Sequence, residues 1–196
     1  MNPSRPVKPI NTTPDRPPAP AGAGRWAARL HGERGQALVE FTFVGMMMCV
    51  LMFGLIDASR ALLVRQVMVN VSREGANLVS RGTLPADAVT AVTQSAAPLD
   101  ITKFGLVIVT IVGHDSSGNL IATDQQIGGG LSGSQSRVAP QGVGGSVNLP
   151  VADLIPDGQS IAVAEVYYQY TPVTPVGNMV AGFMQGPTAL YDVAYF

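Results

Sequence analysis

The chain of 196 residues contains one cysteine and two histidines, and only 13% of its residues are charged. A single cysteine, Cys49, excludes an intramolecular disulfide framework and any zinc site built from several cysteines. The two histidines, His31 and His114, lie far apart in sequence and offer little for a histidine metal centre or a catalytic dyad. We therefore expect no cofactor, no metal and no enzymatic activity. A net charge of −1 argues against a nucleic-acid-binding protein, which should carry a basic face.

The other residues capable of chemistry do not form a recognisable site either. The sequence has no Gly-x-Ser-x-Gly motif. Residues 114–119, His-Asp-Ser-Ser-Gly-Asn, lack the acidic density of a calcium-binding loop, and we expect His114 to lie at the surface in a turn. We expect the methionines around Cys49 to pack against lipid or another helix, with Cys49 as a membrane-buried thiol.

Charge is distributed unevenly along the chain. Residues 1–34 carry six basic and two acidic residues, whereas residues 82–196 carry two basic and eight acidic residues. Between them, residues 35–56 hold a single charged residue, Glu40. This order indicates a chain built around one membrane crossing. Because an excess of Lys and Arg favours the cytoplasmic side, we expect residues 1–34 in the cytoplasm and residues 57–196 outside.

The hydrophobic pattern divides the chain into four segments. Residues 1–35 form a proline-rich, basic leader, which we expect to be disordered because it cannot bury enough apolar surface. Residues 36–56 form a transmembrane helix, since about 20 helical residues span the ~30 Å hydrocarbon core of a bilayer. Residues 57–82 continue this helix as an amphipathic stalk. Residues 83–196 form the extracytoplasmic domain. The apolar stripe of the stalk consists of Leu63, Val67, Val71 and Leu78.

The extracytoplasmic domain combines a short helix with several strands. The helix is predicted over residues 86–97, and the strands are predicted over residues 104–112, 120–126, 161–170 and 190–196. The first two strands should form a hairpin, and the last should be a third or edge strand. Residues 128–149 are rich in Gly and Ser and predict a long flexible loop or flap. The expected class is α+β: a long N-terminal transmembrane helix, an amphipathic stalk and a small antiparallel sheet.

Tyr167, Tyr168 and Tyr170 alternate along one predicted strand. Alternation places neighbouring side chains on opposite faces of a sheet. Packing in the core and at the sheet edge is the simpler interpretation of these tyrosines. A surface for contact with another subunit is the alternative.

The most informative motif occupies residues 34–41, Arg-Gly-Gln-Ala-Leu-Val-Glu-Phe. Glu40 lies within the apolar run, where a carboxylate costs about 2.5–3.5 kcal/mol at the centre of a membrane and by default suggests a function. Its place near the cytoplasmic end would let the side chain reach toward water at a lower cost. Gly35 precedes the carboxylate by five residues, and Phe41 follows it directly.

This arrangement resembles the processing site of type IV prepilins. It is most similar to the TadE/TadG-like minor pilins (pseudopilins) of Tad/Flp type IV pili or type II-like secretion systems. The resemblance places Gly35 at the cleaved position, Gln36 as the first mature residue, Glu40 as the fifth and Phe41 as the sixth.

The resemblance continues beyond the processing site. It includes Gly54 and the Ser-Arg-Glu-Gly-Ala segment at residues 72–76, and it extends loosely to residues 166–175. One departure is Gly45, which follows Val44 at a place where many members have proline.

The resemblance implies cleavage between Gly35 and Gln36 by a prepilin peptidase and participation in assembly of a Tad pilus. The implied partners are that peptidase, other Tad pilins, the pilus assembly platform and inner-membrane lipid. The implied location is the bacterial inner membrane, with a single pass, a periplasmic C-terminal domain and incorporation into a cell-surface pilus as a further option. Glu40 would then pair with the new amine of Gln36 on a neighbouring subunit.

Part of this logic follows from the residues themselves. A peptidase needs an accessible, extended bond, and Gly35 both interrupts a helix and has no side chain to exclude. Cleavage would create an amine at Gln36, one helical turn from Glu40, so a pair within one chain is also possible.

Two alternatives remain open. One is a single-pass, membrane-anchored periplasmic binding or adaptor protein that is never processed, in which Glu40 is incidental. The other is a secreted protein with a cleavable signal peptide, against which the long charged leader and the lack of an Ala-x-Ala site count. The mature N-terminus distinguishes all three.

Overall fold

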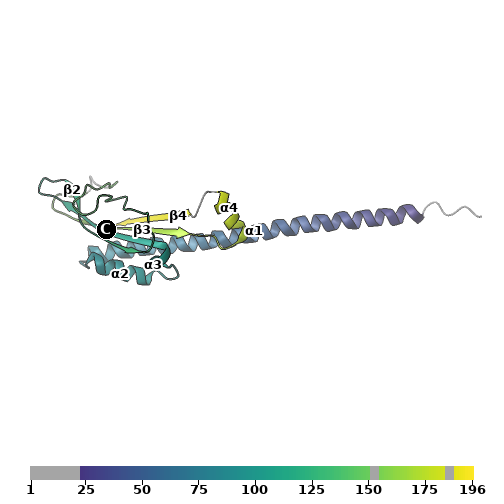
Figure 1. The fold of residues 1–196 in the computed structure, drawn as a ribbon, viewed down its shortest axis with the longest axis horizontal. Coiled ribbons are helices and arrows are strands. Elements are labelled where there is room, and N and C mark those ends of the chain that lie inside the picture. The colour runs from purple at the N-terminus through teal and green to yellow at the C-terminus, as the bar shows by residue number, and fades with distance from the viewer. Residues whose placement is uncertain (1–22, 151–154, 184–187) are drawn as a thin grey trace, which may run out of the picture. The chain divides into compact units, whose positions relative to one another are not determined.

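The computed structural model describes residues 23–150, 155–183 and 188–196 (Figure 1). The chain forms two compact units, Met1–Met48 and Cys49–Phe196. In chain order the elements are α1 (Ala23–Ser80), α2 (Pro85–Ser95), α3 (Ile101–Phe104), β1 (Gly105–His114), β2 (Leu120–Gly129), β3 (Ile161–Tyr170), α4 (Pro175–Phe183) and β4 (Thr188–Tyr195). A long helix followed by a small antiparallel sheet confirms the predicted α+β class.

Helix α1 begins earlier than the sequence predicts, at Ala23 instead of near residue 36. The segment from Ala23 to Arg34 holds three Ala and three Arg, which are strong helix formers, and each internal glycine costs only about 1 kcal/mol. The expectation that Gly35 interrupts the helix is therefore wrong for this structure. Residues 23–35 of the predicted disordered leader are helical, and residues 1–22 lie outside the described residues.

The sheet has the strand order β2-β1-β3-β4, and all neighbours are antiparallel. All four predicted strands are present, and β3 has the predicted bounds. Strands β1 and β2 form the expected hairpin, and β4 is an edge strand as expected. The central strand β1 is rich in β-branched residues, and most residues of β1 and β3 are buried.

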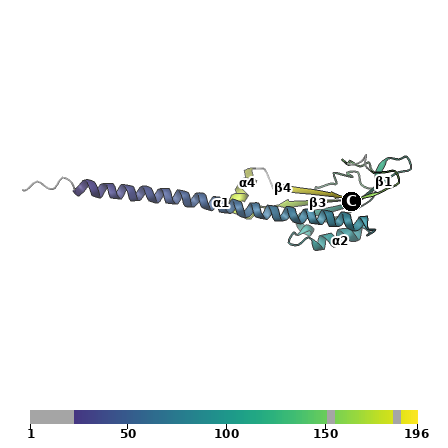
Figure 2. The ribbon, with the colours of Figure 1, turned by 180° about the vertical axis from the view of Figure 1, so that it is seen from behind.

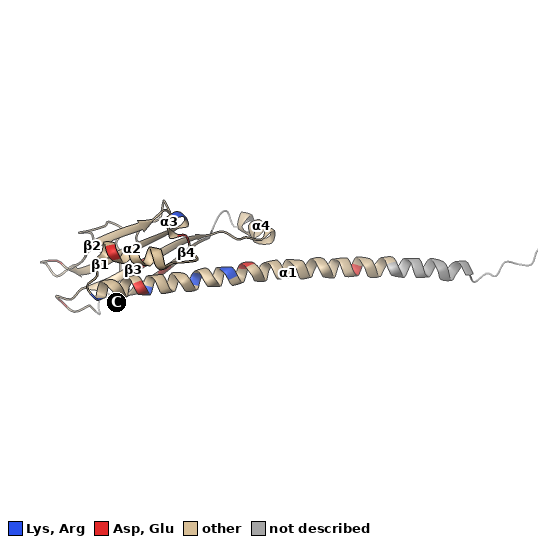
Figure 3. Ribbon diagram, turned by 90° about the horizontal axis from the view of Figure 1, so that it is seen from below, with Lys and Arg blue, Asp and Glu red and all other residues tan. Residues whose placement is uncertain are grey.

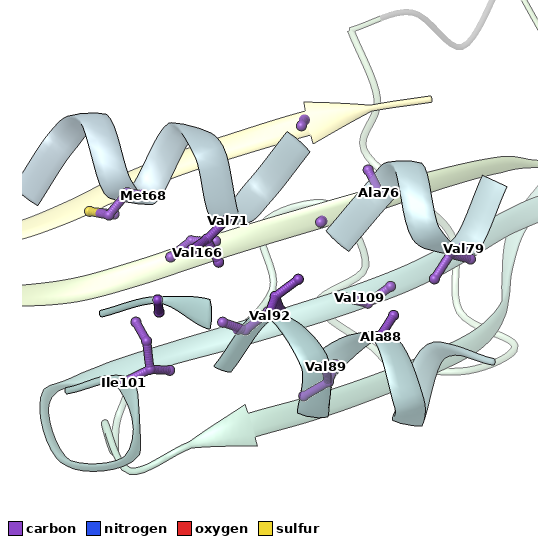
Figure 4. Close-up of a cluster of buried hydrophobic side chains, with 14 of the residues drawn as sticks. Met68, Val71, Ala76, Val79, Ala88, Val89, Val92, Ile101, Val109 and Val166 are labelled. Atoms are coloured by element: carbon purple, nitrogen blue, oxygen red, sulfur yellow. The ribbon is translucent and has the colours of Figure 1, made fainter. Parts of the chain in front are cut away.

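One face of the sheet packs against α1 and α2 (Figure 2). Figure 4 shows side chains from both helices meeting those of β1 and β3 in this core. The α1 residues buried there are Val64, Met68, Val71, Ala76 and Val79. The predicted stripe is only partly correct, because Leu63 is 47% exposed and the buried face is rotated toward Val64 and Met68.

Small residues explain why the buried face of α1 differs from its most apolar stripe. A Cβ added at Gly75 would lie 3.3 Å from the Cβ of Ala164 on β3. Ser72 and Ala76, on the same face, are fully buried. Small side chains let the helix backbone approach the sheet closely, so the packing face is selected by size as well as by hydrophobicity.

The other face of the sheet is covered by residues 130–150. Val138, Ala139 and Leu149 of this segment are buried. Val138 and Leu149 pack with Val112 of β1 and Val163 of β3. The expectation of a flexible flap is therefore wrong for this segment, which has little regular structure but forms the second layer of the core.

The sequence patterns do not predict two short helices. Helix α3 is a single turn whose first residues are capped by the Asp100 side chain, which accepts from the Lys103 N–H at 3.1 Å. Helix α4 begins at Pro175, after Thr174, whose hydroxyl accepts from the Gly177 N–H at 3.1 Å. A threonine cap followed by proline at the first helical position is a known start signal, and it could have revealed α4.

Candidate processing and assembly site

The four predicted site residues lie on successive turns of α1. Gly35 is open, since no atom lies within 4 Å of a Cβ added there. The Gln36 side-chain amide donates to a Glu40 carboxylate oxygen at 3.1 Å. Glu40 and Phe41 are both exposed. The structure thus brings Gln36 and Glu40 together and leaves Gly35 and Phe41 accessible.

This arrangement has a simple chemical capacity. A carboxylate that accepts from the side chain of Gln36 lies one helical turn from the backbone nitrogen of the same residue. If the bond before that nitrogen were cut, the resulting ammonium group would be a stronger, charge-assisted donor than the carboxamide. Glu40 is then available to the amine of its own chain or, being exposed, to that of another.

The segment around and after Glu40 presents apolar side chains outward on all sides. The large apolar residues exposed there are Leu38, Val39, Phe41, Phe43, Val44, Met46, Met47, Met48, Val50, Leu51, Met52, Leu55 and Ile56. The helix is long and apolar enough to cross a membrane, and none of its most apolar window is buried. A core helix of a globular domain would be mostly buried, so this exposure is consistent with a single-pass membrane anchor. No charged residue lies between Glu40 and Asp57 (Figure 3).

The apolar stretch ends at Asp57, whose side chain is held by the segment before α4. One carboxylate oxygen accepts from the backbone N–H groups of Val173 at 3.0 Å and Thr174 at 3.3 Å. The other accepts from the Thr174 hydroxyl. The Tyr170 hydroxyl donates to the Asp57 carbonyl oxygen at 2.9 Å. Hydrogen bonding from the Thr174 hydroxyl, opposed by burial and assisted by the two N–H groups, lowers the pKa of Asp57.

A second buried carboxylate, Glu165 of β3, lies under the segment 130–150 and is fully buried. It accepts from the Ser136 hydroxyl, from the Arg137 N–H at 2.8 Å and from the Tyr191 hydroxyl at 3.0 Å. The Tyr167 hydroxyl donates to the Gln135 carbonyl oxygen at 2.8 Å. Donors from separate parts of the chain thus satisfy Glu165, which fastens the covering segment to the sheet.

The tyrosines around Glu165 have raised pKa values. Burial, together with the negative charge of Glu165, raises the pKa of Tyr167 to about 12, and the positive charge of Arg137 opposes the shift. Burial followed by the Glu165 charge also raises the pKa of Tyr191. The Arg137 guanidinium lies 4.2 Å from the centre of the Tyr191 ring, a cation–π contact. Sequence reasoning misses this cluster, since a lone Glu within an apolar strand is its only signal.

Other sequence candidates have structural roles. His114 is not a surface residue: its side chain is 11% exposed and lies 3.6 Å from the Asp157 carboxylate. Asp115 accepts from the N–H groups of Ser117 and Asn119, both at 2.8 Å, and so closes its own turn. The tyrosines alternate as predicted, with Tyr168 and Tyr170 against the helix-side core and Tyr167 on the opposite face. Within the described ranges, no group of three or more His, Cys, Asp or Glu could hold a metal ion.

Part of the chain is similar to a known protein family. The family model described as TadE-like protein matches residues 35–77. No curated protein matches the chain. No solved structure matches it. The matched segment begins at Gly35 and includes Glu40, the exposed apolar stretch and Gly75, so this part of the chain is similar to TadE-like proteins.

Proposed function

We propose that this chain is a minor pilin or pseudopilin that a prepilin peptidase cleaves between Gly35 and Gln36. The mature subunit, residues 36–196, then takes part in assembly of a Tad-type pilus that serves adhesion or secretion. The observation that carries the proposal is the start of the TadE-like match at Gly35 itself, directly before the turn that holds Gln36 and Glu40.

Gly35 suits the role of the cleaved position on steric grounds. The helix passes through this residue, so the peptidase must unwind a turn to reach the bond in an extended form. Glycine has the weakest helix propensity after proline, about 1 kcal/mol below alanine. It also leaves the scissile bond without a shielding side chain. Unwinding the helix at Gly35 therefore costs less than it would at an alanine.

Glu40 acts after cleavage in this proposal. The new ammonium group of Gln36 and the Glu40 carboxylate are opposite charges in or near lipid, where an unpaired charge is most costly. In a bundle of staggered subunits the carboxylate of one chain would neutralise the amine of the next. Phe41 would contribute apolar contact beside this pair.

The proposed subunit is structural and not catalytic. It requires no metal or cofactor, and its partners are the prepilin peptidase, other Tad pilins, the assembly platform and the inner-membrane lipid. The excess of basic residues before the apolar helix supports a cytoplasmic N-terminus and a periplasmic C-terminal domain. In inverted inner-membrane vesicles the domain at residues 82–196 should resist added protease, and its digestion would overturn this orientation.

N-terminal sequencing of the membrane-bound protein tests the processing step. We expect the mature chain to begin at Gln36. Gly35→Leu should remain a precursor, because the leucine side chain fills space that glycine leaves empty. Gly45→Leu is the matched control, since Gly45 is on the same helix with no atom within 4 Å of an added Cβ, and it should mature normally.

The other outcomes overturn the proposal in distinct ways. An intact N-terminus in the wild-type chain would favour the membrane-anchored binding or adaptor protein. Removal of the entire apolar helix would indicate a signal peptidase. Maturation of Gly35→Leu to the wild-type mass would show that Gly35 is not the recognised residue.

A further inference from the structure

Helix α4 lies in a long stretch of the domain that has no charge. Residues 166–191 contain no Asp, Glu, Lys, Arg or His. Within this stretch Val173 is 57% exposed, Met179 is 61% exposed and Val180 is 47% exposed. Apolar side chains of this kind normally lie in the core, and three of them exposed around one short helix indicate a surface that contacts something apolar.

The position of α4 is fixed at its N-terminal end. Asp57 holds the backbone of Val173 and Thr174 through the hydrogen bonds described above. Gly177 packs against the same carboxylate so closely that an added Cβ would overlap it. Figure 1 shows α4 beside α1 at this point, away from the end of the sheet where α1 terminates. The first turn of α4 is thus attached to the residue at which the uncharged stretch of α1 ends.

Exposed apolar residues of α1 directly precede Asp57, the residue to which α4 is attached. Leu55 and Ile56, directly before Asp57, are both exposed. If α1 spans the bilayer, Asp57 marks the depth at which the hydrocarbon core gives way to the headgroups. Its carboxylate is satisfied by protein donors, which reduces the cost of placing it at that depth. Arg60, one turn farther along α1 and exposed, is at the level where a guanidinium meets lipid phosphate.

We propose that α4 is an interfacial helix that lies on the extracytoplasmic leaflet, with Val173, Met179 and Val180 in contact with the upper acyl chains. Asp57 sets its depth. Because α4 carries no basic residue, apolar burial drives its contact with lipid, and the contact needs no anionic lipid. The proposal rests on membrane insertion of α1, a part of the proposed function, and does not depend on cleavage at Gly35.

Tryptophan fluorescence in lipid vesicles tests this contact. The chain has one tryptophan, Trp26, so Trp26→Phe gives a silent background for single tryptophans in the full-length protein. The reporter for α4 is Met179→Trp. Ile127→Trp on β2 is the matched control, since Ile127 is 59% exposed but lies in the first strand hairpin. Leu55→Trp is the positive control within the span.

Each variant is reconstituted in phosphatidylcholine vesicles that contain lipid brominated near the top of the acyl chain. We expect the fluorescence of Met179→Trp to be quenched at least about threefold more than that of Ile127→Trp, since bromine quenches only on contact and α4 would lie at that depth. Replacing a quarter of the lipid by phosphatidylglycerol should leave this ratio unchanged.

Three results would overturn the proposal, and they differ in what else they affect. Equal, weak quenching of Met179→Trp and Ile127→Trp with strong quenching of Leu55→Trp would remove the interfacial helix and leave the membrane anchor intact. Blue-shifted emission from Met179→Trp that bromine does not quench, and that depends on the protein-to-lipid ratio, would assign the surface to a second copy of the chain. Absence of quenching in Leu55→Trp would overturn membrane anchoring itself.

Discussion

The Ser72 hydroxyl of α1 donates a hydrogen bond of 2.5 Å to the Asp192 carboxylate of β4, although 120 residues separate the two in sequence. Ser72 is the first residue of the Ser-Arg-Glu-Gly-Ala segment within the TadE-like match. The fourth residue of that segment, Gly75, contacts Ala164 of β3. The C-terminal part of the TadE-like segment therefore forms packing and hydrogen-bond contacts between α1 and the sheet.

The first prediction concerns the close packing of α1 against β3 at Gly75. Gly75→Leu should lower the free energy of unfolding of the domain by about 1–3 kcal/mol, because the new side chain has no space between α1 and β3. Gly54→Leu is the control, since it is on the same helix with no neighbouring atom within 4 Å of an added Cβ. Urea unfolding in detergent measures both. Equal stability of the two variants would show that the close approach at Gly75 is not needed.

The second prediction concerns Glu165. Glu165→Ala should leave the Ser136 hydroxyl and the Arg137 N–H without their acceptor, at a cost of about 1–3 kcal/mol for each unsatisfied group. Hydrogen exchange at the Arg137 and Ala139 amides should become faster because the covering segment is released. Asp87→Asn, at an exposed position on α2, should change neither. Unchanged protection of both amides in Glu165→Ala would mean that apolar contacts alone hold the segment.

The third prediction concerns alkaline pH. The pKa of Tyr167 rises from 10.0 to about 12 on folding, so the folded state retains a proton that the unfolded chain loses. This stabilisation is complete below pH 10 and is lost as the pH rises toward 12. The thermal stability of the wild-type protein should therefore fall over this window, and Tyr167→Phe should show a smaller change. An identical pH dependence in both would exclude Tyr167 as the titrating group.

The fourth prediction concerns acid pH at the α4 attachment. The pKa of Asp57 is lowered from 3.8 on folding, so its contribution is complete above that unfolded value and disappears as the pH falls through the lower folded value. Amide exchange at Val173 and Thr174, corrected for the intrinsic rate, should become faster over that range. Asp57→Asn should show the faster exchange already at neutral pH, because the amide is uncharged and a weaker acceptor. Wild-type exchange rates in Asp57→Asn at neutral pH would show that the charge is not required.

The fifth prediction separates cleavage from assembly. Glu40→Leu should be inserted and cleaved normally, since Glu40 lies beyond the scissile bond, but the Gln36 amine would then lack a partner. An unpaired charge in such a setting costs several kcal/mol, and each ~1.4 kcal/mol corresponds to a tenfold change in an association constant. Glu40→Leu should therefore be absent from assembled complexes, and Glu40→Lys should fail as well through repulsion.

Parallel measurement of cleavage and of co-purification with partner pilins decides this prediction. Normal co-assembly of Glu40→Leu would reduce Glu40 to a residue that reaches toward water at the membrane edge. A block in cleavage would instead place Glu40 in the recognition step of the peptidase.

The sequence predicts the strands and the long helix because their signals are local. β3 is a run of β-branched, aromatic and small apolar residues interrupted by Glu165 and Gln169, and residues 41–56 contain no charge. The buried face of α1 is not local, because it depends on Ala164 and Asp192, whose proximity only the folded sheet establishes. The same reason explains the failure at residues 130–150: the segment is held by Glu165 and by the sheet residues Val112 and Val163, and its own composition does not indicate these partners.

The sequence predicts the candidate site because its four residues lie within two turns of one helix. They are Gly35, Gln36, Glu40 and Phe41. The Asp57 attachment joins two segments 116 residues apart, and neither segment alone indicates it. Its one local signal is the Thr174-Pro175 helix start, which predicts a helix but not its partner.

Helix α1 continues without a break from Cys49 to Ser80, and its last part supplies Met68, Val71 and Ala76 to the core. A force along the axis of this helix therefore acts directly on the core between α1 and the sheet. It does not act through a linker at the edge of the domain. Such a load would have to slide the helix past β1 and β3 as a whole, instead of peeling one strand away from the sheet. A subunit extracted from a membrane in this way would carry its domain along in the folded state.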